Sequence, residues 1–378
     1  MKKNISYLYI AAFILLLIAP TIVFGIFGDM IDQTNYEQRS AAEKPSLSIG
    51  NINNFPAAYE AYFNDNIPFR TQLIELNSLM DYFVFQESPS DMVVLGKDGW
   101  LFYNPGGVHY NPMADYCGES TLTEEEMALS AQMLLQARDQ LAMLGKEFVV
   151  MVTPNKECIY GDEFMSSKYP DATDETRCDR LIAYLNENTD LRIVYPKKVI
   201  ENAIDEYPEY SFYYKTDTHW NHLGAYVGAR ELLSELGIEV PELADVSVEY
   251  IDQYSGDLTG MMGLTKYLKY DGDYSVSGYA NADDIQMEFV QDDLNDPSKF
   301  VKYTTKNQDS RKLCVLRDSY MTAMTPYITS QFNEVVLLHR GIYTPELLAE
   351  IDADVVVLQV VEREIESFLT FTVSASGQ

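Results

Sequence analysis

The sequence predicts an α/β fold, in which helices cover both faces of a parallel sheet, preceded by a membrane-spanning helix. The sheet is indicated by continuous apolar runs of strand length, such as 148–152 and 312–316. It is also indicated by the alternation of such runs with helical segments from about residue 120 onward. The spanning helix is indicated by residues 5–28, which contain no charged side chain.

This uncharged segment would extend about 36 Å as a helix, more than the roughly 30 Å of a bilayer's hydrocarbon layer. Lys2 and Lys3 favour an N-terminus inside the cell and the rest of the chain outside, attached to the cell membrane by a single pass. A cleaved signal peptide is the alternative, although its apolar stretch is usually shorter. We expect an anchor at 1–28, a polar spacer at 29–52 and an extracellular α/β domain at 53–378.

Charge and composition exclude two broad classes of protein. The chain carries 27 basic and 58 acidic side chains, a formal net charge of −31. Such a surface repels phosphate backbones, so nucleic acid is not an expected partner. A hydrophobic fraction of 47% and 28 tyrosines exclude a largely disordered chain.

The first elements of the domain are helical. Helices are expected at 53–63 and 69–85, with Pro68 at the break between them. A β-hairpin follows, in which residues 93–95 and 100–103 flank the glycine-containing turn 96–99.

The alternating part of the chain supplies the sheet and its covering helices. Helices are expected at 121–144, 175–187, 221–236, 320–330 and 345–351, and strands at 148–152, 192–195, 312–316, 334–338 and 354–360. Residues 245–310 interrupt this alternation, because they are rich in Tyr, Asp and Gly and contain only short β-like runs. We interpret them as a β-rich insertion within the α/β domain.

The four cysteines are Cys117, Cys158, Cys178 and Cys314. Outside the cell they could form disulfides, and Cys158–Cys178 is one candidate pair, although sequence does not fix the connectivity. Cys314 lies in a predicted buried strand and is expected to be a free thiol. The chain has no C-x-x-C pair, so zinc-ribbon and thioredoxin-type chemistry have no support.

Asp217 and His219 form the first candidate catalytic pair. Two residues apart in an extended segment, both side chains face the same way, so the carboxylate can orient the imidazole as a general base requires. Ser319 follows a predicted strand and begins a helix, where backbone N–H groups could hold an oxyanion. Together they form a candidate nucleophile, base and orienting acid.

Each motif also has an ordinary interpretation. A serine at the start of a helix is often only its N-cap, and an Asp-x-His pair is often a simple polar contact. A metal site is a further alternative, because Asp217, His219 and His222 also read as D-x-H-x-x-H.

Several motifs resemble one family. The stretch Asp217-Thr218-His219-Trp220 resembles the D-[TH]-H-W signature of the alginate O-acetyltransferase AlgX/AlgJ group and of the related DHHW proteins, which are SGNH-hydrolase-like. Further similar segments, in the family's order along the chain, are 64–70, 96–103, 256–258, 316–320 and 361–363. The resemblance therefore covers nearly all of the predicted domain. Position 317 is Arg, where many SGNH proteins carry Gly.

The resemblance implies an SGNH-hydrolase-like, flavodoxin-like sheet and an O-acetyltransferase that needs neither cofactor nor metal. Ser319 would attack an acetyl donor, His219 would take its proton and Asp217 would orient the imidazole. A membrane-bound acyltransferase would supply the acetyl group, and a polysaccharide would accept it. Additional oxyanion or substrate-binding candidates are Asn155, Lys156, Tyr320 and Trp220, the last expected mainly to pack against His219. An esterase with the same three residues and a non-catalytic, membrane-tethered binding or assembly protein remain alternatives.

Overall fold

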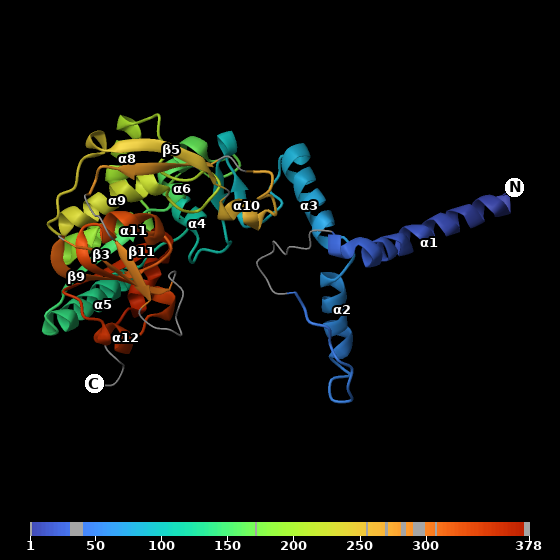
Figure 1. Cartoon of the computed structure of the whole chain (residues 1–378), viewed down its shortest axis with the longest axis horizontal. Coiled ribbons are helices and arrows are strands. Elements are labelled where there is room, and N and C mark those ends of the chain that lie inside the picture. The colour runs from blue at the N-terminus through green and yellow to red at the C-terminus, as the bar shows by residue number, and fades with distance from the viewer. Residues whose placement is uncertain are drawn as a thin grey trace. The chain divides into compact units, whose positions relative to one another are not determined.

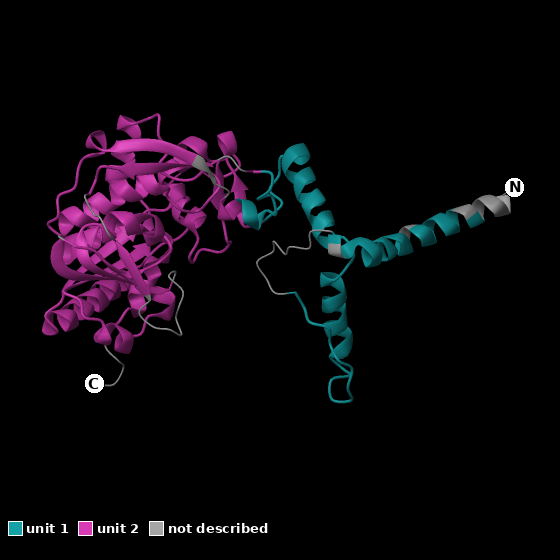
Figure 2. Ribbon diagram, viewed as in Figure 1, with its two compact units in different colours: residues 1–90, 259–267 teal, residues 91–258, 268–378 magenta. Residues whose placement is uncertain are grey.

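The structure is a computed structural model that describes residues 2–30, 41–170, 172–254, 256–268, 271–280, 285–289, 299–306 and 308–373. The chain divides into two compact units, shown in different colours in Figure 2. Unit 1 comprises residues 1–90 and 259–267, and unit 2 comprises residues 91–258 and 268–378.

Unit 1 is helical. It contains α1 (Lys2–Phe27), α2 (Phe55–Asp65) and α3 (Arg70–Met80), and a five-residue π turn, Asp81–Phe85, continues α3. The break between α2 and α3 falls at the predicted Pro68, and Phe69 adopts a left-handed conformation with φ 62°. Among the described residues, α1 is the one helix long and apolar enough to cross a membrane, with a mean hydropathy of 2.7 over Tyr9–Phe27. This character suits either a signal sequence or a single anchor.

The core of unit 2 is a mixed sheet. Among the described residues it has seven strands in the order β4-β3-β11-β9-β10-β8-β7. Five are parallel to one another: β4 (Arg192–Val194), β3 (Glu147–Thr153), β11 (Val355–Val361), β9 (Asp309–Arg317) and β10 (Phe332–His339). β8 (Phe300–Thr304) pairs antiparallel with β10, and β7 (Gln286–Phe289) pairs antiparallel with β8 at the edge of the sheet.

The antiparallel edge corrects the prediction of a wholly parallel sheet. Both β7 and β8 come from the 245–310 region, so the second half of that region belongs to the main sheet. Only residues 305–308 separate β8 from β9, and a parallel crossover needs a dozen or more residues, so β8 must run in the opposite direction. The first half forms a separate antiparallel pair, β5 (Ser247–Tyr254) with β6 (Asp271–Ser277).

Helices cover both faces of the sheet, as predicted. Along β3, Val149 and Met151 belong to one buried apolar cluster, and Val150 and Val152 belong to another. The first cluster includes side chains of α9 (His222–Glu235) and α11 (Met321–Thr329), and the second those of α5 (Glu124–Met143), α7 (Arg177–Asn188) and α12 (Pro345–Glu350). Figure 1 shows α9 and α11 on one side of the sheet and α5 and α12 on the other.

The remaining elements of unit 2 surround this core. The predicted hairpin is present as β1 (Val93–Leu95) and β2 (Leu101–Tyr103). Helix α8 (Lys197–Glu206) is accompanied by three short helices that the sequence analysis did not predict: α4 (Pro112–Tyr116), α6 (Lys156–Phe164) and α10 (Asp257–Met261), of which α10 begins in unit 2 and ends in unit 1. The short 3-10 segments are Lys97–Gly99, Leu243–Asp245, Arg340–Ile342 and Glu362–Thr370.

The cysteines do not form the suggested bridge. All four are free thiols in the structure. Cys178 is fully buried in the cluster formed with α5 and α7, whereas Cys158 lies on α6. Cys314 is a buried free thiol in β9, as predicted.

Candidate active site

Ser319 lies on a turn that the sheet holds firmly. β9 ends at Arg317, and α11 begins at Met321. Within the turn, Asp318 is buried and accepts three hydrogen bonds. The donors are the Val361 N–H at 2.6 Å, the Gln359 side chain at 2.8 Å and the Tyr320 N–H at 2.9 Å. Since Gln359 and Val361 belong to β11, this carboxylate ties the turn to the neighbouring strand, and Ser319 is exposed at its tip.

The same turn leaves one backbone donor beside the serine hydroxyl. Within the described part of the chain, the Ser319 N–H has no hydrogen-bond acceptor, whereas the Tyr320 N–H is engaged by Asp318. A free N–H at this position can stabilise negative charge that develops on an acyl oxygen attached to Ser319. The Tyr320 N–H cannot do so without losing its present bond.

Asp217, His219 and Ser319 meet at the carboxyl edge of the sheet. His219 Nδ1 lies 2.6 Å from Asp217 Oδ1, and His219 Nε2 lies 2.7 Å from Ser319 Oγ. A carboxylate can only accept a hydrogen bond, so Nδ1 carries the proton and Nε2 is left to accept the serine hydroxyl proton. The imidazole is partly exposed, at 27%, and Asp217 is almost wholly buried, at 4%. Residues 100 positions apart therefore form one continuous line of hydrogen bonds.

The surroundings of Asp217 keep its carboxylate ionised. Burial alone would raise the pKa of Asp217, but the hydrogen bond and charge of His219 outweigh burial. The backbone N–H groups of Asp257 and His219 also donate to this carboxylate, at 3.0 and 2.9 Å. Together these groups lower the pKa of Asp217 to about 2. An ionised Asp217 can stabilise the imidazolium that forms when His219 takes a proton.

Lys156 holds the backbone of the Asp-x-His segment in place. Its Nζ donates to the carbonyl oxygens of Asp217 at 2.5 Å, Tyr214 at 3.2 Å and Lys215 at 3.3 Å. The side chain is fully buried, and burial lowers its pKa. All three ammonium protons are used by backbone carbonyls, so the geometry does not support Lys156 as an oxyanion or substrate contact. Its position fits a structural support for the segment that carries the candidate base.

Asn155 is also fully buried and contacts protein groups. Its N–H donates to Glu362 Oε2 at 2.8 Å, and its Nδ2 donates to Asp115 Oδ2 at 3.3 Å. Its Oδ1 accepts from Arg363 Nη1 at 3.4 Å. This arrangement places Asn155 behind the candidate site and does not support the expectation that it touches the substrate.

Tyr320 and Trp220 are packing residues in this structure, since neither side chain is exposed. The Tyr320 ring lies against His219, with 4.8 Å between ring centroids, and its hydroxyl donates to the Thr218 carbonyl at 2.6 Å. Trp220 Nε1 donates to the Tyr320 carbonyl at 2.9 Å. These two bonds link the serine turn to the histidine loop, so both residues position His219 relative to Ser319.

The alternative metal site is not assembled in the form D-x-H-x-x-H. His222 Nδ1 lies 2.6 Å from Asp273 Oδ2, so the two histidines pair with different carboxylates. The ligand atoms that do gather, within 4.8 Å of one another, belong to Asp217, His219 and Asp257. In that group, Asp217 and His219 are already hydrogen-bonded to each other.

The sequence analysis missed several residues that hold the site. Gln359 and Arg363 support the serine turn, because Gln359 bonds Asp318 and the Arg363 guanidinium lies 5.6 Å from the Tyr320 ring centroid. Asp271 of β6 accepts hydrogen bonds from the Lys215 and Thr216 N–H groups at 2.7 and 2.5 Å. Asp257 and Arg363 lie in the family-like segments 256–258 and 361–363, but neither resemblance gave the residue a role.

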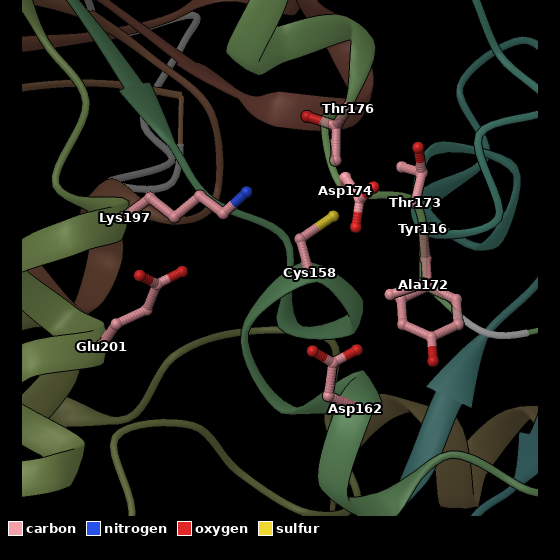
Figure 3. Close-up of a pocket in the computed structure, with 9 residues that line it drawn as sticks. All are labelled: Tyr116, Cys158, Asp162, Ala172, Thr173, Asp174, Thr176, Lys197 and Glu201. Atoms are coloured by element: carbon pink, nitrogen blue, oxygen red, sulfur yellow. The ribbon is translucent and has the colours of Figure 1, made fainter.

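A polar pocket of about 550 Å³ lies elsewhere in unit 2 and contains none of the three candidate catalytic residues. Figure 3 shows the Cys158 thiol of α6 in it, between Lys197 and Asp174. Burial raises the pKa of Cys158 well above that of an ordinary thiol, so the sulfur is a poor nucleophile there. The complete lining is Tyr116, Cys158, Asp162, Ala172, Thr173, Asp174, Thr176, Lys197 and Glu201.

The geometry of a serine, a histidine and an aspartate at the edge of an α/β sheet defines a hydrolase-like site, and comparison of sequences identifies the family. The SGNH hydrolase-like domain of acetyltransferase AlgX matches residues 93–286, about half of the chain. The chain belongs to this family, as its motifs predict. The match includes Asp217 and His219 and ends before Ser319, so the assignment of the serine rests on geometry and on its own motif.

Relatives named probable alginate O-acetylase AlgJ are distantly similar. The protein from Pseudomonas putida is 24% identical over 212 residues, which cover 55% of this chain and 51% of that protein. The protein from Pseudomonas aeruginosa is 25% identical over 275 residues, which cover 71% of this chain and 62% of that protein. The chain thus spans between about half and three fifths of the length of these relatives.

Two solved structures share the fold. A DHHW family protein from Eubacterium siraeum superposes with a TM-score of 0.52 at 20% identity, covering 75% of this chain and 100% of that one. Bacillus cereus PatB1 with a sulfonyl adduct gives a TM-score of 0.52 at 14% identity, covering 74% of this chain and 99% of that one. At these identities the similarity establishes the α/β architecture alone.

Proposed function

We propose that this chain is a membrane-anchored, extracytoplasmic O-acetyltransferase that moves an acetyl group to a hydroxyl of a cell-surface or exported polysaccharide. The observation that carries the proposal is the unbroken line of hydrogen bonds from Asp217 through His219 to the exposed Ser319. Membership of the AlgX acetyltransferase family supports the same reaction type.

In the first half-reaction, Ser319 Oγ attacks the acetyl carbonyl carbon while His219 Nε2 takes the hydroxyl proton. Asp217 stabilises the imidazolium, and the Ser319 N–H holds the negative charge on the acyl oxygen. The tetrahedral intermediate then collapses, the bond from carbon to the donor breaks, and His219 returns the proton to the departing donor group. Acetyl-Ser319 remains.

In the second half-reaction, a sugar hydroxyl attacks the acetyl-Ser319 carbonyl carbon and gives its proton to His219. Collapse of the second intermediate breaks the bond between Ser319 Oγ and the acyl carbon, and His219 returns the proton to the serine. An acetylated sugar leaves. Water would follow the same path and yield acetate, so the choice between transferase and esterase depends on which nucleophile reaches the exposed Ser319.

The proposed partners follow from this chemistry and from α1. If α1 is an anchor with its N-terminus inside, the site lies where acetyl-coenzyme A is absent, and a membrane-bound acyltransferase must deliver the acetyl group. The acceptor we propose is a polysaccharide, by analogy with relatives named as alginate O-acetylases. The distant identity does not extend the analogy to alginate itself.

An acetyl-transfer assay with the full chain tests the proposal. The protein is incubated with a chromogenic acetyl ester, with and without oligosaccharides, and both ester cleavage and sugar acetylation are measured. We expect acetylated sugar from the native chain, and a loss of both signals in the Ser319→Ala variant, which cannot form the acyl-serine. A matched control is Ser211→Ala, since Ser211 lies outside the hydrogen-bonded trio.

The outcomes separate the three interpretations. Cleavage that depends on Ser319 but never yields acetylated sugar, across acceptors of several chemistries, would make the protein an esterase. Equal activity in native and Ser319→Ala protein would contradict the proposed nucleophile. Unchanged glycan acetylation in cells carrying Ser319→Ala would favour a non-catalytic assembly role.

A further inference from the structure

The segment Gly256-Asp257-Leu258 is hydrogen-bonded along the segment that carries the candidate base. The Gly256 N–H donates to Thr216 Oγ1 at 3.1 Å, and the Leu258 N–H donates to the Thr216 carbonyl at 3.2 Å. Between them, the Asp257 N–H donates to Asp217 Oδ2 at 3.0 Å. Three successive N–H groups therefore hold residues 216 and 217, although 40 residues separate the two segments.

This approach requires glycine at position 256. A Cβ atom there would lie 2.0 Å from the Thr216 carbonyl oxygen and 2.4 Å from the Asp217 nitrogen. Both are backbone atoms, so no side-chain rotation could relieve the clash. Glycine at position 256 therefore permits the close contact between the two backbones, and this contact fixes the position of Asp257.

The Asp257 carboxylate faces the histidine loop. Its Oδ1 accepts the Thr218 N–H at 2.9 Å, and its Oδ2 accepts the Thr218 hydroxyl at 2.7 Å. Oδ2 also lies 4.0 Å from His219 Nδ1, and the carboxylate is 31% exposed. Burial, and then the charge of Asp217, raise the pKa of Asp257, as expected for two carboxylates beside one imidazole.

Other groups also surround the imidazole. Asp217 lies at Nδ1 and Ser319 at Nε2, and the neutral Tyr320 phenol ring lies against one face. Two cationic side chains lie behind these groups: Lys156 of α6, bound to the Asp217 carbonyl, and Arg363, 5.6 Å from the centroid of the Tyr320 ring. Asp257 is therefore a second negative charge near the proton on Nδ1.

We propose that Asp257 is a positioning residue for the acyl transfer, which holds Thr218 and Asp217 in place and, as a second carboxylate 4.0 Å from His219 Nδ1, stabilises the positive charge that the imidazole gains when it takes the serine proton. This inference rests on the proposed function, because it concerns the same base. Asp257 contacts neither Ser319 nor the acyl group in this scheme and acts through His219.

The negative charge of Asp257 should shift the pH profile of Ser319 reactivity in one definite direction. His219 must be neutral to accept the serine proton, so the rate of attack by Ser319 rises from acid towards neutral pH. Removing the negative charge of Asp257 makes the positive imidazolium less favourable. In Asp257→Asn, the acid limb of the pH profile should therefore move to lower pH.

The test measures the rate at which phenylmethylsulfonyl fluoride modifies Ser319 in the full chain, as a function of pH, by mass spectrometry. This reagent needs no acetyl donor or acceptor. The variants are Asp257→Asn, Asp257→Glu, which retains the charge, and Asp271→Asn. Asp271 is the matched control, because it is a buried carboxylate that braces Lys215 and Thr216 of the same loop without bonding His219.

We expect the shift in Asp257→Asn, a profile near that of the native chain in Asp257→Glu, and a lower maximal rate without the shift in Asp271→Asn. An unshifted Asp257→Asn profile, or an equal shift in Asp271→Asn, would overturn the inference. Failure of the native chain to react at Ser319 would instead contradict the proposed function. The His219 titration, followed by NMR of labelled imidazoles in the folded full chain, still tests Asp257 in that case.

Discussion

The two halves of the candidate site are held in different ways. The Ser319 turn is tied to the sheet by one buried carboxylate, Asp318, which bonds the adjacent strand β11. The Asp217–His219 loop lies outside the sheet and is braced by charged side chains from separate segments, namely Lys156 of α6, Asp257 of α10 and Asp271 of β6.

This difference indicates that the serine turn is rigid, whereas the position of the base depends on the surrounding polar side chains. The nucleophile gets its position from the strands, so changes there should disturb the fold. The base gets its position from polar groups of other segments, and the charges of the buried ones act more strongly than they would in water. The following changes break or sharpen this contrast, from the largest expected effect to the smallest.

The largest effect is expected from His219→Gln, compared with His222→Gln. Loss of the base should reduce activity towards an acetyl ester by roughly 10³-fold or more. His222 bonds Asp273 instead of the serine, so its loss should change activity less than about threefold. Initial rates for the two variants check the prediction, and equal losses would contradict the assignment of the base.

The next effect concerns the turn. Asp318→Ala leaves three buried donors without an acceptor, so the free energy of unfolding should fall by about 4 kcal/mol. Urea unfolding of the purified chain measures this loss. A change below about 1 kcal/mol would show that the turn does not depend on this carboxylate.

Lys156→Met removes the support beneath the histidine loop. The carbonyls of Asp217 and Tyr214 lose this donor, whereas the Lys215 carbonyl keeps the Leu101 N–H at 2.8 Å, so the change should cost about 3 kcal/mol of stability and also lower activity. Lys215→Met is the matched control, because Lys215 lies near the same Trp100 ring but its ammonium, among the described residues, bonds the exposed Asp98 carbonyl alone, at 3.3 Å. Unfolding midpoints and initial rates compare the two lysines, and similar losses would refute the support role.

Acid should weaken the histidine loop through Asp217. Its folded-state pKa of about 2 lies below the ordinary carboxyl value of 3.8, so the stabilisation is fully present above about pH 4 and is lost as pH falls towards 2. The shift corresponds to about 2 kcal/mol. The difference in unfolding free energy between the native chain and Asp217→Asn should shrink by this amount between pH 5 and pH 2. A constant difference would contradict the ion pair.

Trp220→Phe probes the link between the halves. It removes the hydrogen bond to the Tyr320 carbonyl and part of a fully buried ring, for an expected cost of about 1.5 kcal/mol. Thermal unfolding measures the cost, and activity should fall along with it because His219 loses a constraint. Full activity in a destabilised variant would show that Trp220 contributes to packing and does not position His219.

The parts of this molecule that follow from local pattern are those that the sequence predicts well. Apolar runs and helix boundaries predict the central strands β3, β9 and β11 to within three residues, and the motifs at 217–219 and 319 indicate the meeting of three side chains. The antiparallel strand β8 was missed because its direction depends on pairing with β10, which no local pattern records.

The charged supports of the site could not be predicted for a similar reason. Lys156 looks like a loop cation near an oxyanion site, but its ammonium is directed at carbonyls about 60 residues away in sequence. Likewise, Asp257 has a recognisable motif, yet its role appears only when Gly256 is seen against the Thr216 backbone. Sequence indicates which residues carry the chemistry better than it indicates which residues hold them.

The most direct test of the account is to isolate the covalent intermediate. The full chain is mixed with an acetyl ester, quenched with acid within the first turnover and digested for mass spectrometry. The account predicts one acetyl group on the peptide that contains Ser319, absent in His219→Gln and removed when an acceptor sugar is added before the quench. Turnover of the ester with no acyl group on Ser319, or with the group on another residue, would contradict it.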